Sequence, residues 1–199
     1  MKKILIVFLI AILAACNTTK KVVEAETVEP KKTEVKKVKQ IAREITAKKD
    51  ADGYLIGVAN KESFTDDAFK EWFNSRYDEY NLDEATVAKL KDVLKEYTIR
   101  GFMGTWCGDS RRETPRFFKL LDETGFDQNN FELITVDRTK TTPDNLQEGF
   151  NIIRVPTFIF YKEGKEVGRY VEYPRETLEK DILKIVTNQP YKHSYDKSK

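Results

Sequence analysis

The stretch that most restricts the fold runs from residue 97 to 124, where an apolar segment, a short turn and a helical repeat follow one another. The turn has the sequence Trp-Cys-Gly-Asp-Ser at residues 106–110. Beyond it, Phe117, Leu120 and Leu121 recur at spacings of three and four, which is one face of an amphipathic helix. A buried strand that turns directly into such a helix indicates an α/β domain.

The cysteine of this turn, Cys107, stands where the helix begins. A thiol at a helix N-terminus faces unpaired backbone amides and the positive end of the helix dipole, and both favour the thiolate. Ser110 follows three residues later, in the first turn of the same helix. We expect Cys107 and Ser110 to be the catalytic residues of the site. Trp106, Gly108 and Asp109, which surround them in the turn, are the expected substrate contacts.

A second motif, Arg-Val-Pro-Thr at residues 154–157, immediately precedes another apolar strand. Between the two motifs, residues 131–136 have the continuous apolar pattern of a buried parallel strand. After the second motif, Glu163-Gly164 is typical of a hairpin turn and leads into a strand at 167–171. Residues 175–187 are then expected to form a final helix.

The two motifs together resemble the thioredoxin superfamily and, within it, the membrane-tethered thioredoxin-like lipoproteins. The resemblance covers about residues 97–187 and implies the order strand, helix, strand, helix, β-hairpin, helix. It implies that Cys107 is the nucleophile and that Pro156 is cis and lies opposite it. It also implies that Val155 and Pro156 hold a bound peptide. We therefore expect an α/β fold, a thioredoxin-like three-layer arrangement with a central mixed sheet, preceded by a helical hairpin.

Three residues depart from the pattern of that family. Ser110 stands where a resolving cysteine is expected, and exchange by a dithiol site needs that second thiol to release the partner. Gly101 stands where thioredoxins carry a buried aspartate. Asp109 places a like charge beside a Cys107 thiolate, which disfavours it. The arginines that could offset this charge are Arg111, Arg112 and Arg154.

Two functions stay open from the residues alone. In the first, Cys107 acts as a single thiol that attacks a disulfide or a sulfenic acid, and an external thiol releases it. The expected partners are exported proteins or small thiols. In the second, the domain is a non-catalytic module that binds a protein or peptide partner in the periplasm along the Pro156 edge. Neither function implies a cofactor.

The first sixteen residues predict export and a lipid anchor. Lys2 and Lys3 precede an unbroken apolar stretch at 4–13, which is typical of a signal peptide. The segment ends in Leu-Ala-Ala-Cys, which resembles the lipobox of bacterial lipoproteins and implies lipidation of Cys16. Acyl chains buried in the bilayer would then hold the protein on the membrane. Because Asn17 is not an aspartate, we expect the outer membrane of the cell envelope, facing the periplasm.

Residues 17–50 are rich in Lys, Glu, Thr and Val and hold no aromatic residue. Such a stretch buries too little apolar surface to fold alone, so we expect a flexible tether. Val35, Val38, Ala42 and Ile45 recur at helical spacing, which leaves an amphipathic helix on the membrane surface as the alternative.

Residues 51–96 are interpreted as a helical hairpin that precedes the main domain. Thr65 or Asp66 is expected to cap its first helix, and Asp83 its second. One face of the first helix is aromatic, and this face either packs as core or forms a partner-binding groove. The aromatic residues are Phe69, Trp72, Phe73, Tyr77 and Tyr80.

Charge and cysteine content narrow the function further. Without Lys2 and Lys3, basic and acidic residues balance at 33 each, which gives no support for binding to nucleic acid. The chain has two cysteines in unrelated contexts and one histidine, His193, in the polar tail 188–199. No His/Cys cluster has metal-ligand spacing, so we expect no metal site. We also expect a monomer.

Overall fold

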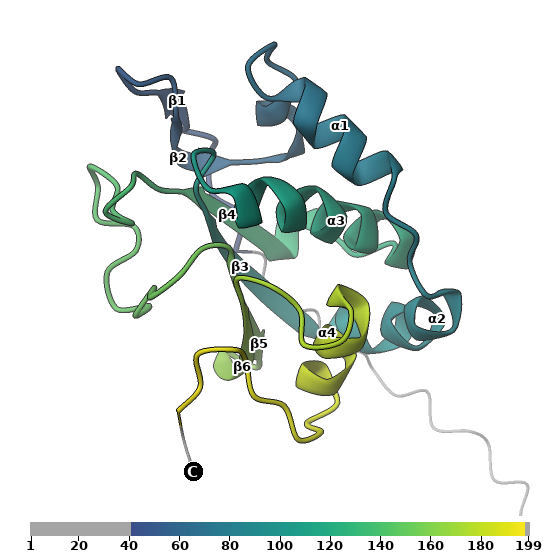
Figure 1. The fold of residues 1–199 in the computed structure, drawn as a ribbon. Coiled ribbons are helices and arrows are strands. Elements are labelled where there is room, and N and C mark those ends of the chain that lie inside the picture. The colour runs from purple at the N-terminus through teal and green to yellow at the C-terminus, as the bar shows by residue number, and fades with distance from the viewer. Residues whose placement is uncertain (1–40, 198–199) are drawn as a thin grey trace, which may run out of the picture. The chain divides into compact units, whose positions relative to one another are not determined.

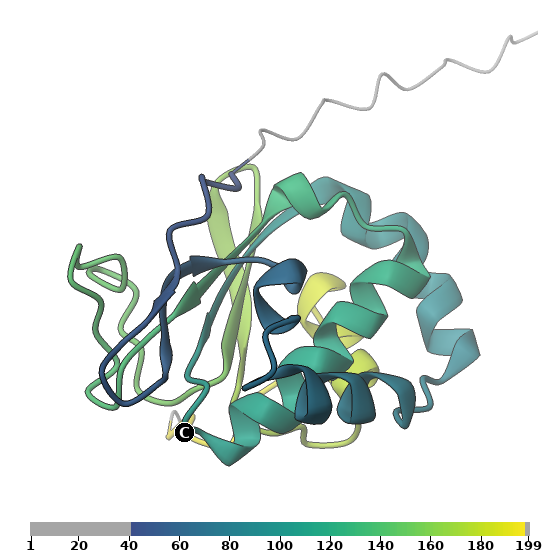
Figure 2. The same ribbon diagram turned by 90° about the horizontal axis from the view of Figure 1, so that it is seen from above.

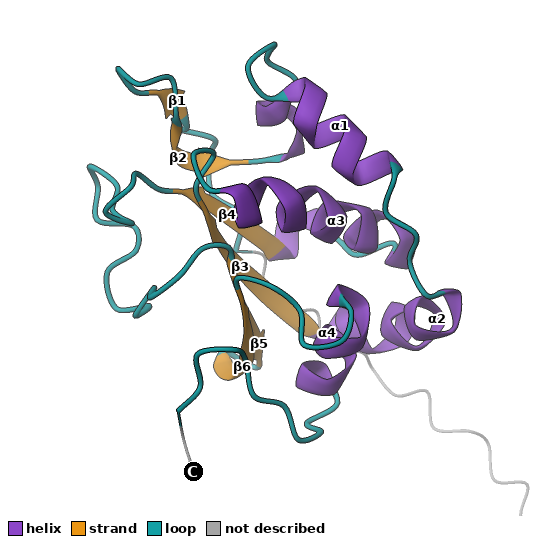
Figure 3. Ribbon diagram, viewed as in Figure 1, coloured by secondary structure: helices purple, strands orange, loops and turns teal. Residues whose placement is uncertain are grey.

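A computed structural model describes residues 41–197. The described residues belong to one compact unit. Its centre is a six-stranded sheet in the order β1-β2-β4-β3-β5-β6 (Figures 1 and 3). Strands β3 and β4 are parallel and every other neighbouring pair is antiparallel, which confirms the expected α/β fold with a mixed sheet. The strands are β1 (Lys48–Lys49), β2 (Leu55–Ala59), β3 (Tyr97–Met103), β4 (Phe131–Thr135), β5 (Thr157–Lys162) and β6 (Lys165–Val171).

The α-helices gather on one side of the sheet, and a long loop between β4 and β5 lies on the other side (Figures 1 and 2). The α-helices are α1 (Lys70–Asp78), α2 (Glu84–Val93), α3 (Gly108–Thr124) and α4 (Leu178–Val186). Short 3-10 turns lie at Lys61–Phe64, Leu94–Glu96 and Gln128–Asn130. Within residues 41–197, no helix is long and apolar enough to cross a membrane.

The sheet has an apolar core on each face because successive side chains of a strand point to opposite sides. On the helix side, the expected inward residues of α3 are fully buried, and Phe117 stacks on Phe158 of β5 with ring centroids 3.9 Å apart. On the loop side, a second cluster contains Phe102, Ile134 and Val155. Trp106 and Cys107 pack against this second cluster, so the β3–α3 turn lies at its edge.

The aromatic segment packs as core. Phe64 is only 1% exposed, and its ring stacks on Phe73 of α1 with centroids 4.9 Å apart. Both rings contact Phe118 of α3, which confirms the core interpretation over a partner-binding groove for these rings. Asp83 caps α2 as predicted, accepting a hydrogen bond from the Thr86 amide at 2.8 Å.

The cap predicted for the first helix was wrong. Helix α1 begins only at Lys70 and its N-cap, Phe69, makes no side-chain cap. Asp66 instead accepts a hydrogen bond from the Ala68 amide at 2.9 Å, so it closes a local turn ahead of the helix. Short side chains such as aspartate form such turns as readily as helix caps, which is why the sequence did not separate the two.

Two strands occur where the sequence predicted none. Strand β2 lies inside the segment interpreted as a helical hairpin, and it pairs with β4. Strand β1 lies inside the expected tether and pairs with β2. The amides of Thr46 and Ala47 donate to the Val58 carbonyl at 3.0 and 2.9 Å, so the segment just before β1 also lies against the sheet. Residues 41–47 are not helical, which excludes the alternative amphipathic helix over that part.

The helix expected between β4 and β5 is absent, and residues 136–156 form a loop. Asp137 starts it with a turn in which its carboxylate accepts hydrogen bonds from the amides of Thr139 and Thr141 at 2.9 and 2.8 Å. Several residues then adopt positive φ angles, which interrupt any helical run. These residues are Lys140, Asn145, Gly149 and Asn151.

The C-terminal part consists of the β5–β6 hairpin, helix α4 and a tail that contacts the domain. The turn at Glu163-Gly164 has two positive φ angles, as the predicted hairpin requires. Helix α4 begins at Leu178, later than expected, because the Asp181 carboxylate binds the amides of Arg175 and Glu176 in a preceding turn. In the polar tail, Tyr195 donates a hydrogen bond from its hydroxyl to the Glu172 carboxylate.

Candidate functional site

Cys107 lies at the junction between β3 and α3, as the sequence predicted. Its extended backbone makes it the N-cap of α3, and its carbonyl accepts the first helical hydrogen bond from the Arg111 amide at 3.0 Å. Its own amide donates to the Gly104 carbonyl at 2.9 Å, which closes the turn after the strand. The thiol is free and the residue is half-buried.

The thiol faces the second motif. The Cys107 Sγ donates to the Val155 carbonyl oxygen at 3.3 Å. The Val155–Pro156 peptide bond is cis, as the resemblance implied. The Pro156 carbonyl in turn accepts a hydrogen bond from the Glu172 amide at 2.8 Å, which fixes this segment to the end of β6. Residues 48 positions apart in the sequence therefore meet at one site.

Ser110 is hydrogen-bonded to the backbone of the turn, whereas the thiol is hydrogen-bonded to Val155. Its side chain is fully buried, at 0% exposure, and its Oγ accepts a hydrogen bond from the Gly104 amide at 3.2 Å. The buried amide of Gly104 needs an acceptor, and the hydroxyl supplies it.

Trp106 anchors the turn to the opposite side of the site. Its Nε1–H donates to the Val136 carbonyl at 2.9 Å. The ring lies so close over Gly104 that a Cβ there would be 2.5 Å from it, so this position requires glycine. Arg138 extends over the outer face of the same ring, with its guanidinium carbon 5.6 Å from the ring centre. Gly108, in contrast, faces open space.

The acidic residue of the turn is paired. Asp109 accepts a hydrogen bond from Arg112 at 2.6 Å, and Arg112 also reaches Glu113 at 2.7 Å. Partial burial lowers the pKa of Arg112, but its hydrogen bonds to Glu113 and Asp109 outweigh burial and raise the pKa above its ordinary value. Of the three arginines expected to offset the charge of Asp109, Arg112 is therefore the one in contact with it.

Glu113 is a buried carboxylate beside the site that sequence reasoning missed. Besides Arg112, it contacts Arg116 at 3.0 Å and accepts a hydrogen bond from the Tyr170 hydroxyl at 3.2 Å. Burial, with the Glu113 charge second, raises the pKa of Tyr170 far above its ordinary value. A glutamate among the apolar residues of an amphipathic helix, with arginines at neighbouring positions, was the signal that could have revealed this network.

The buried aspartate that the family carries has no room here. A Cβ at Gly101 would lie 2.9 Å from the Phe131 ring and 3.0 Å from Leu133 Cδ1. The packing of these two β4 side chains therefore excludes any larger residue without a shift of the strand.

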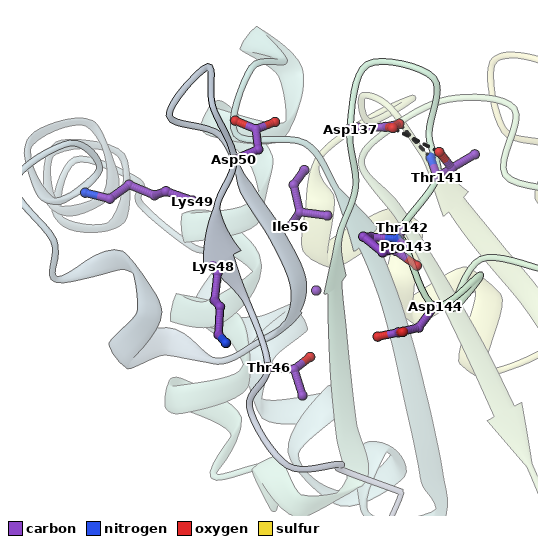
Figure 4. Close-up of a pocket in the computed structure, with 11 residues that line it drawn as sticks. Thr46, Lys48, Lys49, Asp50, Ile56, Asp137, Thr141, Thr142, Pro143 and Asp144 are labelled. Carbon is purple, nitrogen blue, oxygen red and sulfur yellow. Dashed lines mark hydrogen bonds between the residues drawn. The ribbon is translucent and has the colours of Figure 1, made fainter.

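A groove of about 510 Å³ lies away from the thiol, between the β1–β2 strands and the loop after β4 (Figure 4). Lys48 lies on one side and Asp137 and Asp144 on the other, whereas the side chain of Lys49, also a lining residue, points away from the loop. Cys107 is not among its lining residues. Within the part of the chain that the structure describes, no group of three His, Cys, Asp or Glu side chains is placed to hold a metal ion.

Comparison with known proteins identifies relatives of this domain. The sequence model of a family described as Thioredoxin matches residues 59–184, which is more than half of the chain. Thioredoxin-like protein R548 of Acanthamoeba polyphaga mimivirus is 31% identical over 94 residues, covering 47% of this chain and 66% of the relative. Thioredoxin H2 of Arabidopsis thaliana is 33% identical over 84 residues, covering 42% of this chain and 59% of the relative. The chain thus spans about three-fifths to two-thirds of these two relatives.

A solved structure supports the fold. A protein of unknown function from Pseudomonas aeruginosa aligns with a TM-score of 0.51 and 16% identity, covering 66% of this chain and 93% of that protein. The match includes most of that protein, so the two share a fold.

Proposed function

Because the chain belongs to the thioredoxin family, we propose that it carries out thiol–disulfide exchange with Cys107 as its single reactive thiol. One observation carries this proposal. The half-buried thiol stands at the N-cap of α3 and lies 3.3 Å from the Val155 carbonyl, beside the Pro156 segment. A helix N-terminus favours the thiolate, which is the form that attacks a disulfide.

The exchange proceeds in two steps. The Cys107 thiolate attacks one sulfur of a partner disulfide, so that a Cys107–partner disulfide forms and the other partner sulfur leaves as a thiolate that takes up a proton. An external thiolate then attacks the Cys107 sulfur, releases the partner's second thiol and leaves a Cys107–external disulfide. A second external thiol frees Cys107, so two external thiols are oxidised to one disulfide for each partner disulfide reduced.

The second step depends on an external thiol because Ser110 cannot replace one. A hydroxyl does not attack a disulfide under these conditions, and the Ser110 oxygen is engaged with the Gly104 amide. Ser110 therefore maintains the turn around Cys107 and does not resolve the intermediate.

Export and anchoring complete the proposed function. Cys16 and the signal segment lie outside the described residues, and the lipobox supports a lipid anchor in the cell envelope that faces the periplasm. In cells, Cys16→Ser should abolish palmitate labelling and release the protein from the membrane fraction. Labelling that persists in Cys16→Ser would contradict lipidation at this residue.

Trapping the intermediate tests the exchange itself. Wild-type protein incubated with a disulfide substrate should accumulate a mixed disulfide on Cys107, because no internal thiol resolves it. Mass spectrometry should find this adduct in the wild type and in Ser110→Ala and lose it in Cys107→Ala. Dithiothreitol should release the adduct. A wild-type protein that forms no adduct with any disulfide would refute the proposal.

A non-catalytic binding module is the second candidate, and a specific observation favours it. Ile153 and Tyr173 are large apolar side chains with 43% and 40% exposure, and they flank the segment joined by the Glu172–Pro156 hydrogen bond. Such residues offer an apolar edge to a protein or peptide partner. Partners captured in cells equally by wild type and Cys107→Ala would support this second function.

A further inference from the structure

We propose that the disulfide which Cys107 attacks carries carboxylates next to its reacting cysteine, and that Arg111 and Arg138 bind them. The inference rests on the proposed exchange function and names the substrate class of the same site. Two arginines flank the thiol-bearing turn, and neither has an ion-pair partner within residues 41–197. Unpaired guanidinium groups beside a reactive group are suited to recognise carboxylates.

Arg111 lies in the first turn of α3. Arg111 follows Cys107 by four positions, and its amide donates the first helical hydrogen bond to the Cys107 carbonyl. The Arg111 guanidinium lies over the Trp72 ring of α1, with 5.3 Å from its central carbon to the ring centre. The aromatic face holds the cation in place without neutralising its charge.

Arg138 reaches the turn from the loop after β4. Its guanidinium lies over the rings of Tyr54 and Trp106, at 5.1 and 5.6 Å from their centres. It also donates to the Tyr54 hydroxyl at 2.7 Å, so its position is fixed by uncharged groups. Trp106 immediately precedes Cys107, so this second cation lies beside the thiol-bearing turn.

The remaining charges near the turn are already engaged. Asp109 and Glu113 are bound by Arg112. Arg154, which adjoins Val155, lies 4.0 Å from the Glu172 carboxylate, and Tyr195 donates to the same carboxylate. Asp137, which precedes Arg138, is hydrogen-bonded to amides and hydroxyls of Thr139 and Thr141 and keeps its negative charge. Among residues 41–197, the cations beside the turn that have no ion-pair partner are Arg111 and Arg138.

The two cations lie on different sides of the sheet. Trp72, under Arg111, belongs to α1 on the helix side, whereas Arg138 belongs to the loop on the opposite side (Figure 1). Both belong to or contact the β3–α3 junction, because Arg111 lies in the first turn of α3 and Arg138 lies over Trp106. A substrate cysteine with acidic residues on both sides would therefore meet one arginine on each side.

Two probe peptides of matched chemistry test this inference. The disulfide-linked dimers of acetyl-Glu-Cys-Glu-amide and acetyl-Gln-Cys-Gln-amide differ in charge and little else. The rate constant for forming the mixed disulfide on Cys107 is measured for wild type, Arg111→Gln, Arg138→Gln and the double variant. The exposed Arg76→Gln, far along α1 and paired only with Glu79 at 3.8 Å, is the control. Oxidised glutathione serves as a small carboxylate-bearing disulfide.

Each substitution at Arg111 or Arg138 should lower the rate constant for the Glu peptide, relative to that for the Gln peptide, by about two- to fivefold. This is the range expected for one exposed ion pair, about two- to fivefold in rate. The Gln peptide corrects for any effect of the lost cation on the thiolate itself. The preference should shrink at high salt because these cations are exposed. The same arginine dependence with oxidised glutathione would indicate a small anionic substrate, and its restriction to the Glu peptide would indicate an acidic protein segment.

An unchanged ratio between the two peptides in the double variant, with Cys107 still reacting with the Gln peptide, would overturn the inference and leave the exchange function intact. A ratio that falls equally in Arg76→Gln would also overturn it, because the effect would then be one of net charge. A wild-type protein that reacts with neither peptide would instead refute the exchange function.

Discussion

Replacing Ser110 with cysteine should convert the single-thiol site into a dithiol site. Residues three apart in a helix have Cα atoms about 5 Å apart, given a rise of about 1.5 Å per residue and a radius of about 2.3 Å. That distance lies inside the range of about 4.4–6.8 Å that a disulfide spans. Because Cys107 is the N-cap of α3 and Ser110 lies in its first turn, the two sulfurs can bond without moving the helix.

The energetic effect can be worked from the contacts of Ser110. The variant loses the 3.2 Å hydrogen bond from the Gly104 amide, which contributes about 1 kcal/mol. The disulfide closes a loop of about four residues and stabilises the folded state by about 2 kcal/mol through the unfolded chain. The reduced variant should therefore melt about 2–4 °C below the wild type and the oxidised variant a similar amount above it.

Activity follows from the release step. A tethered thiol competes with external thiols at an effective concentration of at least several millimolar, so insulin reduction with about 1 mM dithiothreitol should rise about tenfold in Ser110→Cys. Adding Cys107→Ala should remove the gain, and Ser110→Ala should show no gain over the wild type. If Ser110→Cys forms the 107–110 disulfide and melts as expected but reduces insulin no faster, the missing thiol is not what limits this site.

Three further predictions concern stability. Phe64→Ala should cost about 3–5 kcal/mol in a denaturant titration, because the fully buried ring stacks on Phe73 of α1 and meets Phe118 of α3 edge-on. A loss below about 1 kcal/mol would show that this aromatic cluster is not part of the folded unit. Gly101→Ala should lower stability by about 1–3 kcal/mol, because the added Cβ would lie 2.9 Å from the Phe131 ring, and an unchanged melting temperature would disprove the crowding. Burial lowers the pKa of His193 below 6.5, so the stability that neutral His193 contributes is present above about pH 6.5 and is lost as pH falls through the lower folded value. The melting temperature of the wild type should then fall relative to His193→Gln below that pH, and parallel pH profiles would contradict this.

Local sequence patterns predicted the parts of the fold that local interactions determine. The β3–α3 turn, the Asp83 cap and the Glu163-Gly164 hairpin each depend on residues within a few positions of one another. Their geometry is set by side-chain caps and by allowed φ angles, which can be assigned without knowing the rest of the chain. The same holds for the buried face of α3, since its apolar period matches the helix.

Contacts between distant segments were harder to predict. Strand β2 pairs with β4, more than 70 residues later, and its five residues are too few for periodicity to separate a strand from part of a helix. The loop after β4 replaces an expected helix because its turns satisfy its backbone groups locally. The spacing of residues in the sequence does not show whether such a segment forms a strand, a helix or a loop. That outcome depends on which strand edges and apolar surfaces the rest of the fold leaves uncovered.

The features of the candidate site also separate into those set by local sequence and those set by contacts between distant segments. The sequence by itself determined that a cysteine begins a helix, that a serine replaces the second thiol and that a Val-Pro segment follows, because these are matters of residue identity and local order. Only the tertiary structure decided that the thiol faces Val155, that Ser110 faces Gly104 and that Arg111 and Arg138 lack carboxylate partners. The physical reason is that hydrogen bonds and charge pairing depend on distances between segments, which are set only when the sheet and helices pack together.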